Sequence, residues 1–503
     1  MTSSVNHGDI QGLVRFAYAH MTEACYLLVR IRSVSAARAW LKNAPVTSAI
    51  KLEPRPRTAL QLAFTQQGLE SLNVPRSVIA GFSTEFLSGM AGNEDRSRRL
   101  GDIEANSPSS WRWGNAGDFP HAVVMLFAEA GLLDSWKQSI KGSSWSDAFE
   151  EIHCLPTSNM GGREPFGFID GISQALIDWD QTRRVPINGY ERDYSNVVCL
   201  GEFLLGYRNE YGQYTDRPLL DPGDRGSSEL PFAENQPGKK DLGRNGTYVV
   251  MRQLAQDVRG FWQFLDRSAN SNPGDRQKLG SYMVGRVLAD GSPLVPLSRE
   301  AIPGIGKTPD ETAKNQFTYD SDVNGTRCPY GAHIRRANPR NADIPGAPKG
   351  LISTLIHTLG FGDKNLRDDL ISSTRFHRML RRGREYGPKL TPEEALQTAP
   401  PNAAESGLQF LAINANIQRQ FEFVQNAWLM RTKFDGLTEE SDPLLGNRAA
   451  ITGCPFTNAF SIPQSGTIRR RIMEVPQFVT VRGGAYFFLP GISALRYLGR
   501  LGE

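Results

Sequence analysis

The sequence predicts an α+β fold built of two ferredoxin-like halves, each an antiparallel sheet with helices on one face. Two observations predict it. In the first part of the chain, apolar segments of strand length alternate with helical segments in the order strand–helix–strand–strand–helix–strand. The same alternation returns after residue 245. In this order, helices pack back onto one side of an antiparallel sheet.

In the first half, short apolar runs predict the strands and amphipathic runs predict the helices. The first helix follows a serine-rich stretch in which Ser33 or Ser35 is the expected N-cap. The predicted strands are 24–31, 46–52, 58–65 and 121–128, and the predicted helices are 33–41, 66–82 and 129–142.

The second half repeats the pattern. Its predicted strands are 246–252, 408–414 and 485–489. Two helical faces follow the first two strands, and they are formed by Leu254, Val258, Trp262 and Leu265, and by Ile417, Phe421, Val424 and Trp428. Residues 156–245 are rich in Pro, Gly, Asp and Asn, and the halves are expected to join near 205–245, which predicts two domains, 1–225 and 226–503.

Composition and charge exclude several classes of protein. A net charge of +4 is small for 503 residues and argues against a nucleic-acid binder. The five cysteines have neither zinc nor redox spacing, and there is no Cys-x-x-Cys-His motif for covalent haem attachment. With no visible signal peptide and no membrane-spanning run, the chain is predicted to be cytoplasmic, with reduced thiols and no membrane partner.

Residues 328–340, Cys-Pro-Tyr-Gly-Ala-His-Ile-Arg-Arg-Ala-Asn-Pro-Arg, contain the most informative histidine. Small residues precede His333, so a flat, bulky group can approach the backbone. Imidazole is the commonest protein metal ligand, and a histidine is one standard ligand of haem iron. The arginines that follow, Arg335, Arg336 and Arg340, suit carboxylates such as haem propionates. An ordinary surface or packed histidine remains the alternative.

A second stretch, Glu164-Pro-Phe-Gly-Phe-Ile-Asp-Gly-Ile-Ser-Gln, places Asp170 in a Gly-x-x-Asp-Gly frame. Asp-Gly is a common turn dipeptide, so a simple turn is one interpretation. A turn does not need the large apolar residues that precede Asp170. A carboxylate at the edge of an apolar cavity is therefore the competing interpretation.

Together with Arg-Met-Leu-Arg-Arg-Gly-Arg-Glu-Tyr-Gly at 378–387, these two stretches resemble the dye-decolorising peroxidase family. Weaker similarity runs through most of the chain, and the length resembles the larger fungal or cyanobacterial-type branches. One departure is Val287, where the family pattern leads us to expect tryptophan. The resemblance implies two ferredoxin-like domains of the dimeric α+β barrel superfamily and a non-covalently bound haem b.

The resemblance also implies roles for individual residues. His333 would be the proximal iron ligand. Asp170 would be the distal acid and base that moves the peroxide proton, and Arg381 the distal cation that stabilises charge as the O–O bond breaks. The remaining expected site residues are Gly171, Arg335 and Phe168 at the cofactor, Asp442 or alternatively Glu422 as the partner of His333, and Tyr386 and Trp428 as surface electron-transfer residues.

The sequence therefore predicts a haem b peroxidase that reduces hydrogen peroxide and oxidises dyes, phenols or similar donors by one-electron steps. The alternative is a haem-binding protein that handles haem or iron without efficient turnover, which would not need Asp170 and Arg381. A hydrolase using Asp170 with His153 or His377, and a scaffold without a cofactor, are further alternatives. Assembly into a homo-oligomer is left open.

Overall fold

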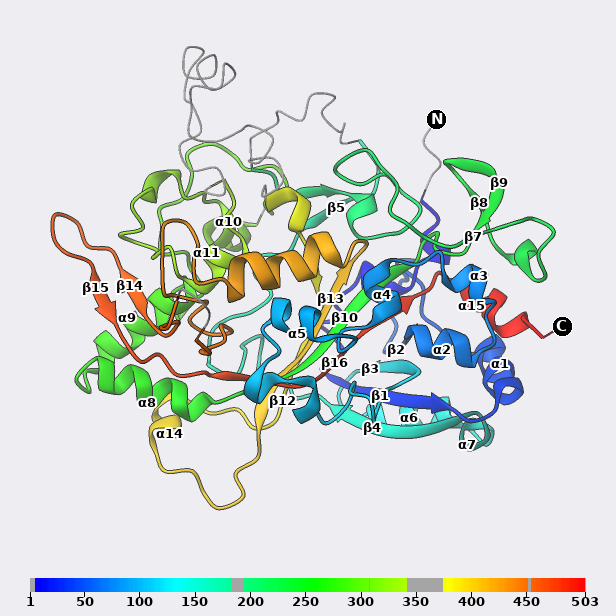
Figure 1. Cartoon of the computed structure of the whole chain (residues 1–503), viewed down its shortest axis with the longest axis horizontal. Helices are drawn as coiled ribbons and strands as arrows, with labels where there is room; N and C mark the ends of the chain where they lie inside the picture. Colours follow the sequence, from blue (N-terminus) through cyan, green and yellow to red (C-terminus); the bar gives the residue numbers. More distant parts are fainter. Residues whose placement is uncertain (1–4, 183–193, 307, 342–373, 451–453, 503) are drawn as a thin grey trace, which may run out of the picture.

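One antiparallel sheet of nine strands runs through the whole molecule (Figure 1). The structure is a computed structural model, and it describes residues 5–182, 194–306, 308–341, 374–450 and 454–502. The strand order is β11–β13–β10–β16–β2–β3–β1–β4, and β12 also pairs with β13. The four strands at one end come from the first half of the chain, and the remaining strands come from the second half.

The first half has the ferredoxin-like order of elements. β1 pairs with β3 on one side and with β4 on the other, and β3 also pairs with β2, so the order is β2–β3–β1–β4. Ser33 is the N-cap of the first helix and accepts a hydrogen bond from the Ala36 amide. The elements are β1 (Glu23–Ile31), α1 (Val34–Asn43), β2 (Thr58–Phe64), β3 (Ala122–Ala128), α6 (Leu133–Lys141) and β4 (Phe149–Pro156).

The second half repeats this topology. Its strands are ordered β11 and β12, then β13, β10 and β16. The pairing of Phe488 in β16 with Phe64 in β2 joins the two halves of the sheet. The elements are β10 (Thr247–Gln256), α8 (Val258–Ser268), β11 (Leu380–Arg381), β12 (Arg384–Tyr386), β13 (Ser406–Asn414), two π-helical segments η9 (Gln418–Glu422) and η10 (Val424–Met430), and β16 (Val479–Leu489).

Shorter helices and three small sheets surround the main sheet in the described part of the chain. The further helices are α2 (Gln66–Ser71), α3 (Arg76–Ile79), α4 (Thr84–Ser88), α5 (Glu94–Leu100), α7 (Trp145–Ala148), α9 (Pro273–Val284), α10 (Pro309–Asn315), α11 (His333–Ala337), α14 (Pro392–Leu396) and α15 (Ile492–Arg500). The small sheets consist of β5 (Leu176–Asp178) with β6 (Val197–Cys199), of β7 (Leu219–Leu220), β8 (Phe232–Ala233) and β9 (Gln236–Asp241), and of β14 (Phe460–Ile462) with β15 (Arg470–Ile472).

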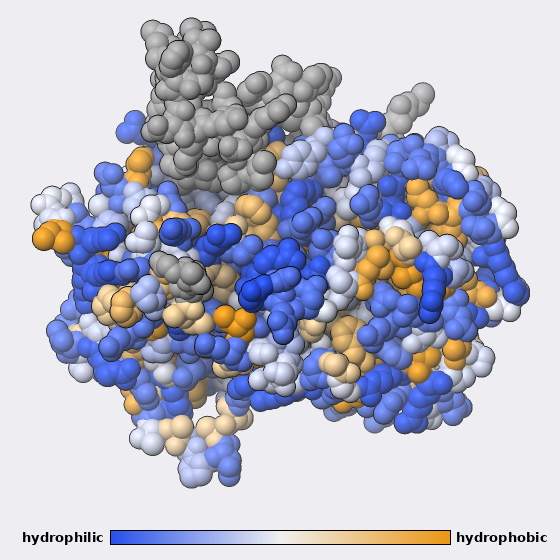
Figure 2. Space-filling view, viewed as in Figure 1, coloured by the Kyte–Doolittle hydropathy of each residue, from blue (hydrophilic) through white to orange (hydrophobic). Residues whose placement is uncertain are grey.

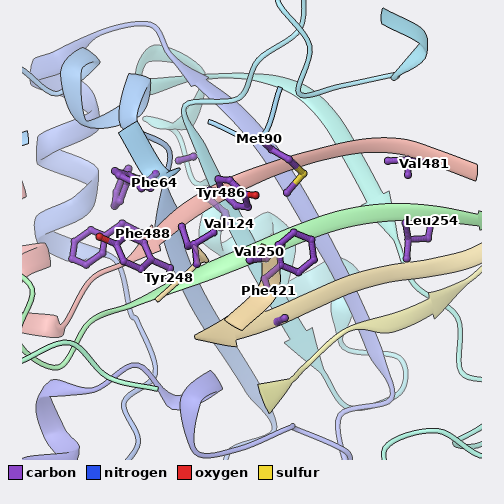
Figure 3. Packing of buried hydrophobic residues seen from close by; sticks show 14 of the residues in the cluster. Phe64, Met90, Val124, Tyr248, Val250, Leu254, Phe421, Val481, Tyr486 and Phe488 are labelled. Atoms are coloured by element: carbon purple, nitrogen blue, oxygen red, sulfur yellow. The ribbon is translucent and has the colours of Figure 1, made fainter. Parts of the chain in front are cut away.

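The sheet is buried on both faces because alternate strand residues point to opposite sides. On one face, residues of both halves, such as Val124, Val250 and Tyr486, form a continuous core with side chains from α1, α2, α8 and η9 (Figure 3). On the other face, Val249 and Phe487 pack under the irregular segments 10–21 and 198–207. The prediction of helices on one face is therefore incomplete, since irregular chain covers the second face.

One predicted strand of the first half is wrong, and one strand was not predicted. Residues 46–52 are not a strand: only Ser48 makes an isolated bridge, to Gln11, and prolines 45, 54 and 56 in this region lack the amide that a ladder needs. The strand that completes the first half is β4, which the prediction missed. β4 is the edge strand of the sheet and is rich in polar residues, so its apolar signal is weak.

Other differences are local. The predicted helix 66–82 is divided into α2 and α3, with Pro75 immediately before α3. Leu254 belongs to strand β10 and not to the following helix. The short strands β11 and β12 were missed because each has only two or three residues. The domain boundary between residues 225 and 226 stays a prediction.

Hydrophilic side chains dominate the face of the molecule in Figure 2, and apolar residues are scattered over it in small groups. Within the described ranges, no helix has the length and apolar character needed to cross a membrane.

Candidate active site

His333 is held by a buried carboxylate. It is the first residue of α11, and its Nδ1 lies 3.0 Å from Oδ2 of Asp442. The other oxygen of Asp442 accepts hydrogen bonds from the amides of Leu444 and Leu445 at 2.9 and 2.8 Å. Because a carboxylate can only accept here, Nδ1 carries the proton. In the described part of the chain Nε2 has no hydrogen-bond partner, so this nitrogen is the one available to a ligand.

The charges around His333 link it to two further predicted residues. Burial lowers the pKa of the imidazole, but the Asp442 carboxylate and its hydrogen bond raise it, and the net pKa lies above the ordinary value. Arg381 also lowers this pKa and Asp170 raises it. Both side chains are thus close enough to act on the imidazole, although they come from distant segments.

Asp170 and Arg381 form an ion pair. Oδ1 of Asp170 lies 3.1 Å from Nη2 of Arg381, and the two side chains are 39% and 36% exposed. The amide of Gly171 donates to the same carboxylate oxygen at 2.6 Å, and Gly171 itself has a φ of +77°, which favours glycine. This accessible pair can exchange protons and hold an anion, in contrast to a fully buried structural ion pair.

The loop that carries Asp170 is organised by Glu164. This buried carboxylate accepts hydrogen bonds from the amides of Phe166 and Phe168 at 3.0 and 2.9 Å and from the side chain of Gln256 at 2.8 Å. Burial raises the pKa of Glu164 to about 7, although these hydrogen bonds oppose the shift. The Phe168 ring is 3% exposed and belongs to the apolar core beside α9. Phe168 therefore supports the loop from the core, and its contact with a cofactor stays a prediction.

Arg381 is positioned by its backbone. β11 pairs with β13 through Leu380 and Arg381. The side chain of Gln174 accepts from the Arg381 amide at 3.1 Å and donates to its carbonyl oxygen at 3.3 Å. Two residues later, Gly383 lies so close to β13 that a Cβ atom would collide with the Gln409 carbonyl oxygen. This close approach explains why glycine follows the two arginines.

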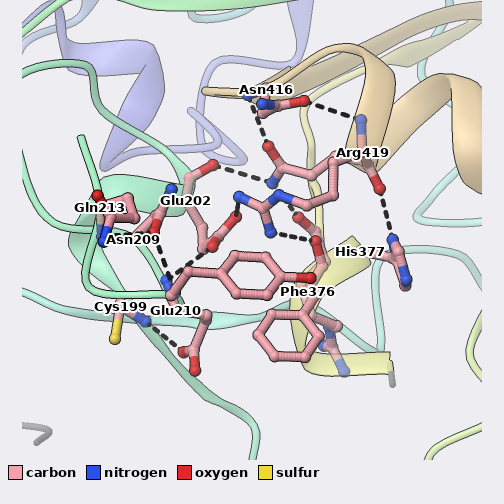
Figure 4. Close-up of polar contacts among 12 residues, drawn as sticks. Cys199, Glu202, Asn209, Glu210, Gln213, Phe376, His377, Asn416 and Arg419 are labelled. Carbon is pink, nitrogen blue, oxygen red and sulfur yellow. Dashed lines mark hydrogen bonds and ion pairs between the residues drawn. The ribbon is translucent and has the colours of Figure 1, made fainter. Parts of the chain in front are cut away.

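A buried polar network fixes the chain just before β11, where the 3₁₀ turn η8 (Thr374–His377) lies (Figure 4). Arg419 donates to the Phe376 carbonyl at 2.7 Å and to the Glu202 carboxylate at 2.7 Å. His377 Nδ1 lies 2.5 Å from the Arg419 carbonyl. Gln420 donates to the carbonyls of Glu202 and Arg378 at 2.9 and 2.6 Å. The network ties the segment before Arg381 to the loop after β6.

The three arginines after His333 are held by contacts within the protein. Arg335 is 2% exposed, pairs with Asp322 at 3.3 Å and lies between the rings of Tyr319 and Tyr330. Arg336 and Arg340 are also buried and donate to backbone carbonyls. These contacts anchor α11 and the segment after it, and the expected cofactor contact of Arg335 stays a prediction.

A cationic cluster that joins the predicted Arg340 to Arg378 and Arg286 lies beside the site. Arg378 donates to the Tyr194 hydroxyl at 2.6 Å, and Arg340 lies 5.0 Å from the same ring. Burial raises the pKa of Tyr194, but Arg340 and Arg378 lower it more, to about 8. Burial and then Arg340 lower the pKa of Arg286 to about 10, with a smaller contribution from Arg381.

The alternative partner of His333 and the two expected electron-transfer residues make contacts away from His333. Glu422, the alternative partner of His333, pairs with Arg96 at 3.0 Å and accepts from Tyr486 at 2.9 Å. The two residues expected at the surface are largely covered, since Trp428 is 6% and Tyr386 is 7% exposed.

The hydrolase alternative required a histidine beside Asp170. His153 lies 2.5 Å from the Asp118 carboxylate, and His377 is stacked on Phe423 with ring centroids 3.7 Å apart. The described contacts of Asp170 are with Arg381 and with its own loop, so they do not support that alternative.

Comparison with known proteins agrees with this geometry. No protein-family model matches the chain. A dye-decolorizing peroxidase of Auricularia auricula-judae is 28% identical over 516 residues, which cover 98% of this chain and 87% of the relative. A multifunctional dye peroxidase of an Amycolatopsis species is 34% identical over 362 residues, which cover 68% of this chain and 62% of the relative.

Solved structures give the same result. The crystal structure of the Auricularia enzyme with imidazole matches 99% of this chain and 100% of that chain with a TM-score of 0.71 and 26% sequence identity. The similarity therefore spans both halves of the sheet and the segments that carry His333, Asp170 and Arg381. On these grounds the chain belongs to the dye-decolorising peroxidase family.

Proposed function

We propose that this chain is a haem b peroxidase that reduces hydrogen peroxide to water and oxidises dyes, phenols or similar donors in one-electron steps. The observation that carries this proposal is that one imidazole, backed by a buried carboxylate, is electrostatically coupled to an accessible carboxylate–guanidinium pair. A haem-handling protein would need the first feature but not the second.

The residues present fit haem. Nδ1 of His333 is occupied by Asp442, and a metal-bound histidine usually donates its other N–H to such an acceptor. Nε2 would therefore bind the iron. The arginine cluster beside the site complements the negative propionates of a porphyrin, since guanidinium groups pair well with carboxylates. The chain has no Cys-x-x-Cys-His motif, which agrees with non-covalent binding.

Bound haem supplies the redox centre for peroxide reduction and donor oxidation. The other chemistry falls to residues of this chain. Asp170 takes the proton from one oxygen of hydrogen peroxide and returns it to the other oxygen, which leaves as water. Arg381 stabilises the negative charge that develops on this leaving oxygen. Asp442 keeps the His333 imidazole electron-rich through the Nδ1 hydrogen bond.

We assign the oxidation of bulky donors to the protein surface. Tyr386 is the residue that would relay the electron. Its hydroxyl donates to Glu405 at 2.8 Å, and burial and this carboxylate raise the pKa of Tyr386 above the ordinary value. A tyrosine that loses an electron also loses its proton, and Glu405 is placed to accept it. Trp428 packs against His377 and Phe423 inside the protein, which supports a packing role for it more than a surface role.

An absorbance spectrum of the haem-loaded protein tests the function. We expect a ferric haem spectrum that changes on one equivalent of hydrogen peroxide and returns when a phenol or dye is added. A haem band that only bleaches would favour haem handling. A protein that binds no haem would make His333 an ordinary histidine and overturn the proposal.

A further inference from the structure

Two cysteines lie on the neighbouring strands β1 and β4, at one edge of the main sheet. In the register of β1 and β4, Cys25 lies opposite Pro156 and Leu27 lies opposite Cys154. Residues two apart on a strand share a face, and so do directly opposed residues of an antiparallel pair. Cys25 and Cys154 therefore lie diagonally on the same face of the sheet. A register shift between Leu28 and Val29 adds twist next to the pair.

The two thiols differ in exposure and are in contact. Cys25 is 3% exposed within the core, whereas Cys154 is exposed on the edge strand of the sheet. A hydrogen bond from the Cys25 thiol favours the thiolate of Cys154 and lowers its pKa, although burial opposes this. The same hydrogen bond, together with burial, raises the pKa of Cys25. The exposed sulfur is thus the nucleophile and the buried sulfur keeps its proton.

Helix α6 supplies positive charge to this pair. Lys137 and Lys141 both favour the thiolate of Cys154, whereas Glu151 opposes it. Burial lowers the pKa of Lys137, but the two cysteines raise it. Lys141 is also paired with Glu151 at 2.5 Å and Lys137 with Asp134 at 3.4 Å, so carboxylates offset part of this positive charge. Cationic surroundings and solvent access are the features that distinguish reactive cysteines from inert buried ones.

We propose that Cys25 and Cys154 form a dithiol that hydrogen peroxide oxidises to a disulfide between β1 and β4. The Cys154 thiolate attacks one peroxide oxygen, the O–O bond breaks, and hydroxide leaves and takes up a proton to form water. The sulfenic acid of Cys154 is then attacked by the Cys25 sulfur, which loses its proton. The S–O bond breaks, a second water leaves, and the S–S bond forms. Two thiols supply two electrons to one peroxide, and because β4 is an edge strand, it can shift to accommodate the bond.

The test uses the full-length, haem-loaded protein treated with hydrogen peroxide and then blocked with iodoacetamide. Peptide mapping should show a Cys25–Cys154 disulfide, and the free thiol count should fall by two from the five present.

Cys154→Ser should keep the other four thiols free. Cys25→Ala should stop at the sulfenic acid, which dimedone traps. Lys137→Met should slow the reaction several-fold, while Cys454→Ser, remote in sequence, should leave it unchanged.

The variant Asp170→Asn separates this reaction from the peroxidase function. Direct attack by Cys154 does not use Asp170, so disulfide formation should continue in this variant even if peroxidase activity is lost. Loss of the disulfide in Asp170→Asn would show that oxidants made at the haem site are responsible, and it would overturn the proposal. Full retention of all thiols in the wild-type protein, or oxidation of Cys25 in Cys154→Ser, would overturn it as well.

Discussion

The carboxylate of Asp170 and the guanidinium of Arg381 lie 3.1 Å apart, although one follows β4 and the other ends β11. Each of them comes from a different half of the chain. The pair forms because two sets of hydrogen bonds position its backbone segments. Glu164 organises the loop that carries Asp170, and the side chain of Gln174 binds the Arg381 backbone. Both side chains stay accessible, and both act on the pKa of His333.

Removing either member of this pair should slow the reaction with peroxide. In the proposed mechanism, Asp170→Asn removes the proton acceptor, and Arg381→Leu removes the charge that stabilises the leaving oxygen. Stopped-flow absorbance should show a bimolecular rate that is lower by about 10²–10³ with haem content preserved. The adjacent Arg382 is the matched control, since its guanidinium donates to backbone carbonyls, those of Leu13, Val14 and Arg381, and not to Asp170. Arg382→Lys should lower the melting temperature and leave the peroxide rate unchanged, and equal rate losses in all three variants would contradict the assignment.

The partner of His333 should control the affinity and potential of the haem iron. In Asp442→Asn the imidazole loses an anionic acceptor, so haem affinity should fall by about 10–100-fold and the midpoint potential should rise. Haem titration and spectroelectrochemistry measure these quantities. Asp322→Asn is a matched control, because Asp322 is equally buried but pairs with Arg335. If this control shifts the potential as much as Asp442→Asn, the role of Asp442 is wrong.

Gln174 should act only through Arg381. Its amide makes two hydrogen bonds to the Arg381 backbone, so Gln174→Leu should let β11 shift and lower the peroxide rate by about tenfold, equivalent to 1.4 kcal/mol. Residues that act through one another are not additive. In an Arg381→Leu background, Gln174→Leu should therefore cause no further loss of rate. An additional tenfold loss there would assign Gln174 an independent role.

Glu164 should make stability depend on pH. Its pKa is raised to about 7 in the native state from 4.5 in the unfolded chain, so the native state binds more protons between these values. The free energy of unfolding should therefore fall as pH rises from 4.5 to 7, by about 3 kcal/mol from this group, and level off above pH 7. Denaturant titrations at several pH values measure it.

Two variants check the origin of this pH dependence. Glu164→Gln should remove the slope between pH 4.5 and 7. Gln256→Leu removes a hydrogen bond that favours the ionised carboxylate, so it should extend the slope to higher pH. A slope that is the same in the wild type and in Glu164→Gln would assign the pH dependence to other groups.

Tyr386 should matter for bulky donors and not for small ones. Tyr386→Phe removes the hydroxyl that donates to Glu405 while it preserves the ring, so oxidation of a large dye should fall about tenfold. Steady-state rates with a small phenol should stay near the wild-type value. Tyr211→Phe is the control, since Tyr211 is 43% exposed and stacks on Phe376 with ring centroids 4.2 Å apart. Equal losses for both donors would place the effect of Tyr386 in the haem pocket.

Local signals in the chain were sufficient for much of this description. Strands such as β1, β3, β10 and β16 are long apolar runs. Because apolar side chains are driven out of water, such runs identify buried strands in the sequence itself. The motif around His333 and the Gly-x-x-Asp-Gly loop are short and contiguous, so their residues could be named without coordinates. The family comparison also confirms the predicted α+β fold.

Tertiary structure decided the features that depend on distant segments. The edge strand β4 carries polar residues because only one of its sides is paired, and the short strands β11 and β12 are stabilised by β13 rather than by their own composition. Arg335 and Arg381 look alike in the sequence, yet Asp322 and two tyrosine rings enclose one, whereas Asp170 leaves the other accessible. The partner of a charged side chain is set by long-range packing, and for that reason the role of each arginine could not be assigned from its neighbours in the chain.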